Sequence, residues 1–274
     1  MQNSEEIFSQ TEADRPEYKA HKVFKELDRA IEFYDLLDFS VMGFATSGTK
    51  SIINIDSLLY SSIKSTLESI KMILQRGHIG DAFCLLRKYY DSCILNLYTN
   101  VYLENNKNEA NLLIEDVVHW MDGTKKLPHD TFKSMRQYLQ KFEKSKEILD
   151  LVFQDQNYEL TRQRCNDHTH YNYFDNVLVN DNRLHFVDRI EQLNRFQNDL
   201  ENIFVLHVSC IFHINNHYMM SGDYMDSLEY GIKPEEGSQY WVADFIQEIF
   251  DDVIKVKRPE IVEFIKKNTA MKLT

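Results

Sequence analysis

The stretch GDAFCLLRKYYDSCILNLYTNVYL, residues 80–103, decides the fold class of this chain. It contains no proline, its one glycine is its first residue, and its apolar side chains fall on more than one side of the helix that it predicts. A helix that is apolar nearly all round lies in the interior, because other elements have to cover each of its sides. The stretch therefore predicts a central helix with further helices packed around it.

The composition of the whole chain also favours helices. Only 8 of its 274 residues are glycine and 4 are proline, whereas a strand-rich fold needs a turn after roughly every dozen residues. Residues 176–183 are expected to form a turn or a short hairpin. Apolar residues at helical spacing predict helices over about 15–37, 51–75, 80–103, 108–121, 130–142, 144–153, 184–220, 239–255 and 259–268.

These segments predict an all-α fold, a helical bundle with long central helices and a C-terminal helical extension. We expect residues 1–49 to form an N-terminal helix and tail, residues 50–220 the bundle, and residues 221–274 an acidic C-terminal extension. The chain is long enough to bury a sizeable core in one large domain or two small ones.

The cysteines and the apolar runs indicate a cytoplasmic protein. The four cysteines show no CxxC spacing and lie far apart, and we expect no signal peptide, which fits reduced thiols. The longest apolar runs are far shorter than the roughly 20 residues that a membrane helix needs, so no membrane association is expected. The cysteines are Cys84, Cys93, Cys165 and Cys210.

The net charge of −12 limits the partners that the surface can bind. A broad cationic surface for duplex DNA is not expected, although a few arginines are enough for a local phosphate site. Acidic residues concentrate between Met219 and Asp252, where nine carboxylates accompany a single base, Lys233. This segment could bind a basic partner, or it could be a solvated face of the protein.

A second stretch, RQRCNDHTHYN at residues 162–172, carries the residues most suited to chemistry. Cleavage of RNA through its 2′-hydroxyl needs a proton donor or acceptor that works near neutral pH, and histidine meets this need. It also needs a fixed cation on the phosphoryl oxygens, which arginine supplies through a rigid set of donors. Two arginine–histidine pairs have five residues between their members, Arg164 with His170 and Arg162 with His168.

Two neighbouring residues could assist such a pair. Asn166 could orient a histidine or donate to a phosphate, and Tyr171 could hydrogen-bond or stack on a base. The same spacing also fits a polar, hydrated helix end, and spacing alone favours that simpler interpretation.

Together, the segments GDAFCLLRKYYDS (80–92) and RQRCNDHTHYN resemble the HEPN domain superfamily. The resemblance covers roughly residues 50–220, and only the R-x4-6-H motif in it is specific. It implies an all-α bundle that forms a homodimer, so that two motifs line one cleft. It also implies a metal-independent endoribonuclease, of a kind found in antiphage defence, toxin–antitoxin pairs and RNA processing.

Carried over to this sequence, the resemblance makes Arg164 the residue that contacts the scissile phosphate and His170 the general acid or base. Arg162 with His168 is the alternative register. RNA is then the substrate, and no metal or other cofactor is expected.

The resemblance also extends to the central helix. Arg87 and Asp91 are similar to the charged pair that some members direct toward the motif. The family usually has Asn, Asp or His directly after the arginine, whereas here Cys165 follows Arg164 and Asn166 lies one place later.

Two further interpretations remain open. In one, the chain is a non-catalytic helical module that binds a partner effector or regulator through its acidic C-terminal segment, since some family members lack nuclease activity. In the other, His213 and His217, which share a helix face at positions i and i+4, bind a metal with Asp223 as the nearby third ligand. A second candidate ligand set is His168 and His170 with either His185 or Asp175.

Overall fold

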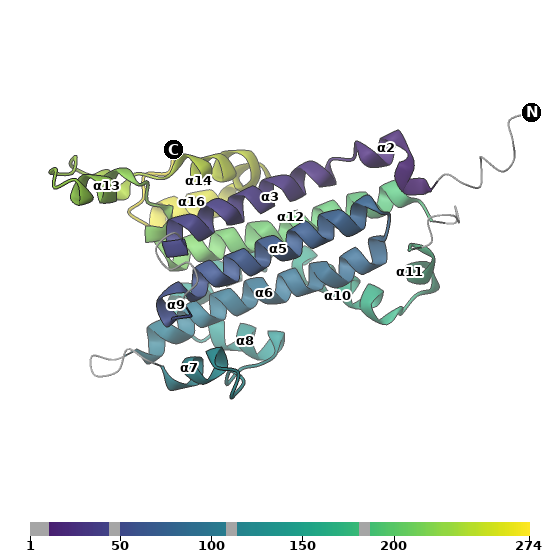
Figure 1. Cartoon of the computed structure of the whole chain (residues 1–274), viewed down its shortest axis with the longest axis horizontal. Helices are drawn as coiled ribbons and strands as arrows, with labels where there is room; N and C mark the ends of the chain where they lie inside the picture. Colours follow the sequence, from purple (N-terminus) through teal and green to yellow (C-terminus); the bar gives the residue numbers. More distant parts are fainter. Residues whose placement is uncertain (1–10, 44–49, 108–113, 181–186) are drawn as a thin grey trace, which may run out of the picture. The chain divides into compact units, whose positions relative to one another are not determined.

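The computed structural model describes residues 11–43, 50–107, 114–180 and 187–274. Regular structure in these ranges is helical (Figure 1), apart from one isolated bridge that pairs Met220 with Val242. The expected all-α class is therefore confirmed. In the described ranges, no helix has both the length and the apolar character needed to cross a membrane.

The long helices agree well with the periodicity of the sequence, and the short ones agree less well. The helices are α2 (Pro16–Lys19), α3 (Val23–Asp38), α5 (Ile55–Gln75), α6 (Ile79–Asn106), α7 (Glu115–Met121), α8 (Phe132–Leu139), α9 (Glu143–Val152), α10 (Asn157–His170), α11 (Phe174–Leu178), α12 (Arg189–Ile214), α13 (Asp223–Glu229), α14 (Asp244–Ile249), α15 (Lys255–Lys257) and α16 (Pro259–Asn268). A π-helical turn at Phe250–Ile254 joins α14 to α15.

Three local expectations were wrong. The predicted turn or hairpin at 176–183 was wrong for residues 176–178, which belong to α11, whereas Val179 and Asn180 do form a turn and residues 181–183 lie outside the described residues. The helix predicted to reach residue 220 ends at Ile214, where Asn215 leaves helical geometry with φ −120° and ψ 65°. Helix α13 was not predicted, because it buries no residue and so has no apolar stripe to signal it. Residues 108–113 of another predicted helix also lie outside the described part.

The chain forms two compact units, each made of three separate segments. Unit 1 comprises Met1–Asp35, Leu59–Cys93 and Asp155–Phe204, and unit 2 comprises Leu36–Leu58, Ile94–Gln154 and Val205–Thr274. The division that we expected, into 1–49, 50–220 and 221–274, consists of continuous segments of the chain, and it stays a prediction.

Unit 1 is organised around the tyrosine side chain of Tyr34 on α3. Its hydroxyl lies 2.9 Å from that of Tyr89 on α6, and its ring packs against Tyr60 on α5 and Phe204 on α12. All three tyrosine rings are buried. Four helices therefore meet at one hydrogen-bonded aromatic centre, as expected for a bundle with long central helices.

Unit 2 contains the second half of α6 and the C-terminal helices. Tyr98 and Tyr102 on α6 pack against Tyr138 on α8, which covers this part of α6. Arg258, directly before α16, donates from Nη2 to the carbonyl of Leu151 at 2.9 Å, and it also donates to Val152, so its guanidinium caps the C-terminal end of α9. These contacts attach α8, α9 and α16 to the unit.

Helix α6 is buried along most of its length, which confirms that it is the central helix. The residues with under 2% exposure include both apolar and polar side chains, and the buried polar ones carry hydrogen bonds that matter below. The buried residues of α6 are Ile79, Gly80, Ala82, Phe83, Leu86, Tyr89, Tyr90, Cys93, Ile94, Asn96, Leu97, Tyr98, Thr99, Val101 and Tyr102.

A substitution on α5 tests this burial pattern. Leu67 is completely buried, so Leu67→Ala should lower the free energy of unfolding by about 2–5 kcal/mol, through lost apolar burial and the cavity left behind. Leu58 lies on the same helix with 46% of its surface exposed, and Leu58→Ala should change stability by less than about 0.5 kcal/mol. Urea unfolding followed by circular dichroism measures both, and equal losses would contradict the packing described here.

Candidate functional site

The motif of the sequence lies within a helix of unit 1. Residues Arg162 to His170 form the last turns of α10, so the segment is neither a loop nor the start of a helix. Positions four apart share a helix face, which groups Arg162, Asn166 and His170 on one face and places Arg164 and His168 on another. The structure therefore divides the predicted site residues into two sets.

Arg164 is held by a buried carboxylate on α12. Its Nε donates to Oδ2 of Asp199 at 2.6 Å and its Nη2 donates to Oδ1 at 2.9 Å. The Asp199 side chain has no exposed surface, whereas 32% of the Arg164 side chain is exposed. These hydrogen bonds raise the pKa of Arg164, so it stays cationic, and they leave the Nη1 side of the guanidinium for a ligand.

The same carboxylate accepts a third hydrogen bond from α10. The hydroxyl of Thr161 donates to Oδ1 of Asp199 at 2.7 Å. Thr161 and Arg164 are three residues apart and therefore neighbours on the helix surface. Asp199 thus fixes both the position and the rotation of α10. Neither Asp199 nor Thr161 was among the residues predicted from the sequence, because their pairing joins positions far apart in the chain.

His168 is buried and cannot reach a macromolecular substrate. Its ring stacks on Phe83 of α6 with ring centres 4.2 Å apart and an angle of 6° between the planes. Burial, with a smaller effect from Arg164, lowers the pKa of His168 to about 4, so the ring is neutral at pH 7. Its Nδ1 atom has no hydrogen-bond partner among the described residues.

The other face of α10 carries the predicted charged pair of α6. Arg162 forms an ion pair with Asp91, and Asp91 lies 3.9 Å from the guanidinium of Arg87 one turn earlier on α6. The contacts Arg162–Asp91 and His168–Phe83 show that α10 runs antiparallel to α6. Arg87 therefore lies beside the middle of the motif. Arg87 and Asp91 were the charged pair that we expected to face the motif.

Asn166 and Cys165 have different environments on the helix. The Oδ1 atom of Asn166 is buried and has no hydrogen-bond partner in the part of the chain that the structure describes. Cys165 is buried, and burial raises the pKa of its thiol, so it is not a nucleophile. All four cysteines of the chain are free thiols.

The end of α10 presents exposed rings. His170 is exposed, and the chain then leaves the helix at Tyr171, which adopts left-handed geometry with φ 49°. The N–H of Asn172 donates to the carbonyl of Asp167, the bond that closes a Schellman motif. Tyr171, Tyr173 and Phe174 are all exposed directly after it. Among the described residues, Tyr171 is the one non-glycine residue with positive φ.

Neither predicted register places its two side chains on one helix face. Residues six apart on an α-helix are separated by about 9 Å along the axis and by about 120° around it. Arg164 is partly exposed and His170 is exposed, whereas Arg162 is mostly buried against Asp91 and His168 is buried. Within one chain, each arginine therefore points away from its predicted histidine.

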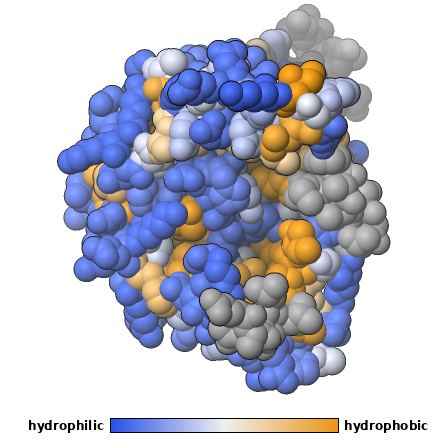
Figure 2. Space-filling model, turned by 90° about the vertical axis from the view of Figure 1, so that its left-hand side faces the viewer, coloured by the Kyte–Doolittle hydropathy of each residue, from blue (hydrophilic) through white to orange (hydrophobic). Residues whose placement is uncertain are grey.

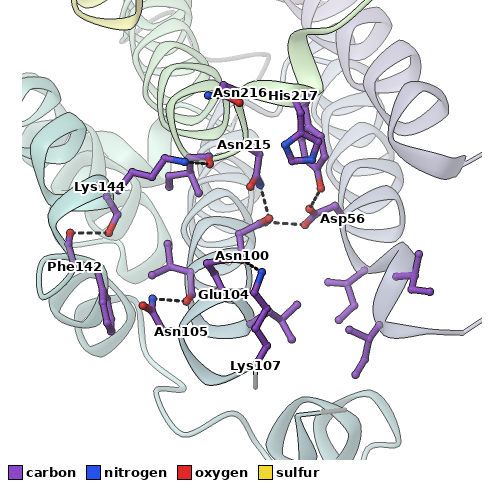
Figure 3. A pocket seen from close by; sticks show the side chains of 18 of the residues that line it. Asp56, Asn100, Glu104, Asn105, Lys107, Phe142, Lys144, Asn215, Asn216 and His217 are labelled. Atoms are coloured by element: carbon purple, nitrogen blue, oxygen red, sulfur yellow. Dashed lines mark hydrogen bonds and ion pairs between the residues drawn. The ribbon is translucent and has the colours of Figure 1, made fainter. Parts of the chain in front are cut away.

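Unit 2 contains a second candidate site that the sequence did not suggest. A pocket of about 660 Å³ lies among the first turns of α5 and α9, the second half of α6 and the end of α12 (Figure 3). We call it the Asp56 pocket, after one of the acids that line it. The lining residues used below are Asp56, Asn100, Phe142, Lys144, Asn215, His217 and Tyr218.

Asp56 accepts hydrogen bonds from three neutral groups. Its Oδ1 accepts from the side-chain amides of Asn96 at 2.7 Å and Asn100 at 2.8 Å, and its Oδ2 accepts from the hydroxyl of Tyr218 at 2.6 Å. Burial raises the pKa of Asp56, and the three hydrogen bonds act in the opposite direction. The group is therefore a largely enclosed carboxyl with well-defined partners.

A second layer fixes the two amides. The Nδ2 of Asn215 donates to Oδ1 of Asn100 at 2.5 Å, and His207 Nε2 lies 3.0 Å from Oδ1 of Asn96. Burial lowers the pKa of His207 to about 3, so the ring is neutral. The amide nitrogen of Asn96 donates to Asp56, so the group that faces His207 is the amide oxygen, which can only accept. His207 therefore carries its proton on Nε2. One signal in the sequence was available, since Asn96 and Asn100 interrupt the apolar face of α6.

The histidines proposed as metal ligands have other neighbours. His213 is buried and packs on Phe264 with ring centres 5.0 Å apart, and the ring of His217 lies against Tyr218. In the described ranges, no three His, Cys, Asp or Glu side chains are grouped closely enough to hold a metal ion. His185, a member of the second candidate ligand set, lies outside the described residues.

Comparisons with known proteins give the chain no relative. No protein family model matches it, and no curated protein or solved structure is detectably similar to it. The HEPN resemblance therefore rests on the motif residues themselves.

The burial of His168 predicts part of the acid sensitivity of the fold. The pKa of His168 is about 4 in the folded state, against an ordinary value of 6.5 for a histidine in an unfolded chain, so the unfolded chain binds the proton more readily. The neutral, buried His168 makes its full contribution to the free energy of unfolding above pH 6.5. This contribution is lost as the pH falls toward 4, and the loss is at most about 3 kcal/mol. His168→Phe, which keeps the ring stack on Phe83, should flatten the stability curve between pH 6.5 and 4.

The control for that measurement is His78→Phe, because His78 is exposed. Urea unfolding at a series of pH values gives the free energy of unfolding for each variant. A His168→Phe curve that parallels the wild-type curve would show that His168 is not buried as described.

Proposed function

We propose that the chain is a metal-independent endoribonuclease of the HEPN type that acts in the cytoplasm as a homodimer, in antiphage defence or a toxin system. The observation that supports this best is the bidentate hold of Asp199 on Arg164. A buried carboxylate fixes the guanidinium through Nε and Nη2 while 32% of the Arg164 side chain stays exposed, which suits a cation that must meet a phosphate.

The proposed chemistry uses Arg164 and His170. The 2′-hydroxyl loses its proton and attacks the adjacent phosphorus, and the 5′-oxygen leaves and takes up a proton, giving a 2′,3′-cyclic phosphate and a 5′-hydroxyl. His170 moves one of these protons, because it is the exposed histidine of the motif. Arg164 donates to the phosphoryl oxygens. This choice favours the Arg164–His170 register over the register that uses the buried His168.

The homodimer supplies what one helix lacks. Arg164 and His170 of one chain point in different directions, so a phosphate that meets both has to meet them from two copies of α10. Arg87 and Asp91 then act by positioning Arg162 within the motif. Asn166, one turn before His170 on the same helix face, orients that histidine.

A cleavage assay with matched variants tests this proposal. The protein in EDTA should cut a labelled single-stranded RNA, and His170→Ala should lower the rate by at least 100-fold because the proton carrier is lost. His78→Ala removes an exposed histidine elsewhere in unit 1 and should cut like the wild type. An RNA with one 2′-deoxynucleotide should resist cleavage only at that position. Full activity of His170→Ala would exclude the assigned role.

Arginine is tested by a conservative change. Arg164→Ala would leave Asp199 buried without its cation, so a loss of activity would be confused with a loss of stability. Arg164→Lys keeps the charge but loses the two-point contact that fixes its direction. The lysine variant is therefore the appropriate companion of His170→Ala in the same assay.

A substitution at Tyr171 tests RNA binding, because we expect it to raise the stability of the protein and to weaken its binding of RNA. Left-handed geometry costs a non-glycine residue about 1 kcal/mol, and the exposed ring of Tyr171 offsets little of this by packing. Tyr171→Gly should therefore raise the free energy of unfolding by up to about 1 kcal/mol while it weakens the binding of single-stranded RNA. Fluorescence anisotropy and urea unfolding measure the two effects. A variant that is more stable and binds RNA as before would remove Tyr171 from the RNA site.

A second candidate function is partner binding through the acidic segment. Helix α13 extends away from α14 and α16 in Figure 1, and the face seen in Figure 2 is mostly hydrophilic with separate hydrophobic patches. Met225, Leu228, Tyr230 and Ile232 are exposed among the carboxylates of this segment, with Tyr230 at 80%. Exposed apolar side chains ringed by acids suit a basic, partly apolar protein partner. This interpretation predicts that the purified chain does not cut RNA.

A further inference from the structure

The Asp56 pocket in unit 2 is a built cavity that the proposed nuclease activity does not use. Its volume of about 660 Å³ lies within the range typical of small-molecule sites, roughly 300–1,000 Å³. Figure 3 shows Asp56, Asn100, Asn215 and His217 pointing toward one another around it. These side chains are held by the hydrogen bonds described above, so the pocket is formed before any ligand arrives.

The carboxylate of Asp56 lacks a cation in the part of the chain that the structure describes. Its three hydrogen-bond donors are two amides and a phenol, all neutral. An enclosed charge with neutral partners alone is costly compared with one that has a counter-charge. The raised pKa of Asp56 is consistent with this cost.

The cationic side chains of the wall are already engaged elsewhere. Lys144 donates to the carbonyl oxygen of Ile214 at 2.6 Å, at the C-terminal end of α12. Lys107 forms an ion pair with Glu104. Partial burial and the nearby Lys144 ammonium lower the pKa of His217, so this ring is neutral at pH 7. None of the three groups neutralises Asp56.

The rest of the lining suits the apolar part of a ligand. Phe142 presents an aromatic ring, and aliphatic side chains from the 3-10 turn at Ile52–Asn54, from the start of α5 and from the second half of α6 complete that part of the wall. Aromatic rings and carboxylates together favour organic cations, because a ring face attracts positive charge. The aliphatic residues are Ile52, Ile53, Ile55 and Val101.

We infer that the Asp56 pocket binds a small organic cation, a primary amine with an apolar body. The ammonium group donates to Oδ2 of Asp56, which accepts one hydrogen bond within the protein whereas Oδ1 accepts two. The apolar body lies against Phe142 and the isoleucines. The pocket uses no residue of the motif helix α10, so a test of this inference does not test the nuclease proposal.

Three probes of equal size and different charge test the inference. Benzylamine is cationic at pH 7, benzyl alcohol is neutral and benzoate is anionic. Titration of the full chain, followed by protein NMR or by thermal unfolding, should show saturable binding of benzylamine at millimolar concentration. Benzyl alcohol and benzoate should bind at least tenfold more weakly. Equal binding of the alcohol, or tighter binding of benzoate, would overturn the inference.

Variants then locate the charge. Asp56→Asn keeps the size of the side chain and should weaken benzylamine at least tenfold. Asp226→Asn removes an exposed acid of α13 and should leave the affinity unchanged, which separates the pocket from general attraction to an acidic protein. Wild-type affinity of Asp56→Asn would overturn the inference.

A third variant covers the case in which Asp56→Asn does not fold, since an amide nitrogen would replace the oxygen that accepts from the Tyr218 hydroxyl. Tyr218→Phe keeps the ring and the carboxylate but removes one neutral donor from Oδ2. The carboxylate then depends more on a ligand cation, so the affinity for benzylamine should stay equal or rise. A tenfold loss of affinity in Tyr218→Phe would overturn the inference.

Discussion

The carboxylate of Asp199 has no exposed surface, so the protein itself has to supply its hydrogen-bond partners. Arg164 and Thr161 of α10 supply three of them. Removing the arginine would leave an enclosed charge without compensation, which is far more costly than losing an exposed ion pair. The position of α10 on α12 is therefore determined by one group, and the arrangement of the motif residues follows from it.

Once Arg164 is directed at Asp199, the rotation of the helix decides the exposure of every other motif residue. His168, four residues later, is carried to the same side and becomes buried on Phe83. His170 is turned away from it and remains exposed at the helix end. A histidine in a motif can thus serve either packing or proton transfer, and the partner of a nearby arginine selects between them.

Periodicity was sufficient to predict α5, α6, α12 and α16, because each buries a long apolar stripe. It was insufficient where side-chain hydrogen bonds decide the outcome. Asn215 ends α12 and donates to Asn100, a residue far away in the sequence. The same limit applies to both sites. The spacing of the motif identified candidate residues but not their faces, and the Asp56 pocket draws its polar groups from several helices with no common spacing.

The two sites also differ in how well their local requirements are met. Around Asp56, each amide and hydroxyl has a partner, as in a rigid site prepared for a small ligand. On α10, by contrast, the Nδ1 of His168 and the Oδ1 of Asn166 find no partner among the residues that the structure describes, and Tyr171 holds a costly backbone geometry immediately after the helix. Strain and unmet hydrogen bonds persist in proteins mainly where function requires them. Buried polar atoms without partners also occur elsewhere among the described residues, for example on His213. The end of α10 differs because two such atoms and the strained backbone of Tyr171 lie within six residues, which is an argument for function that spacing alone did not provide.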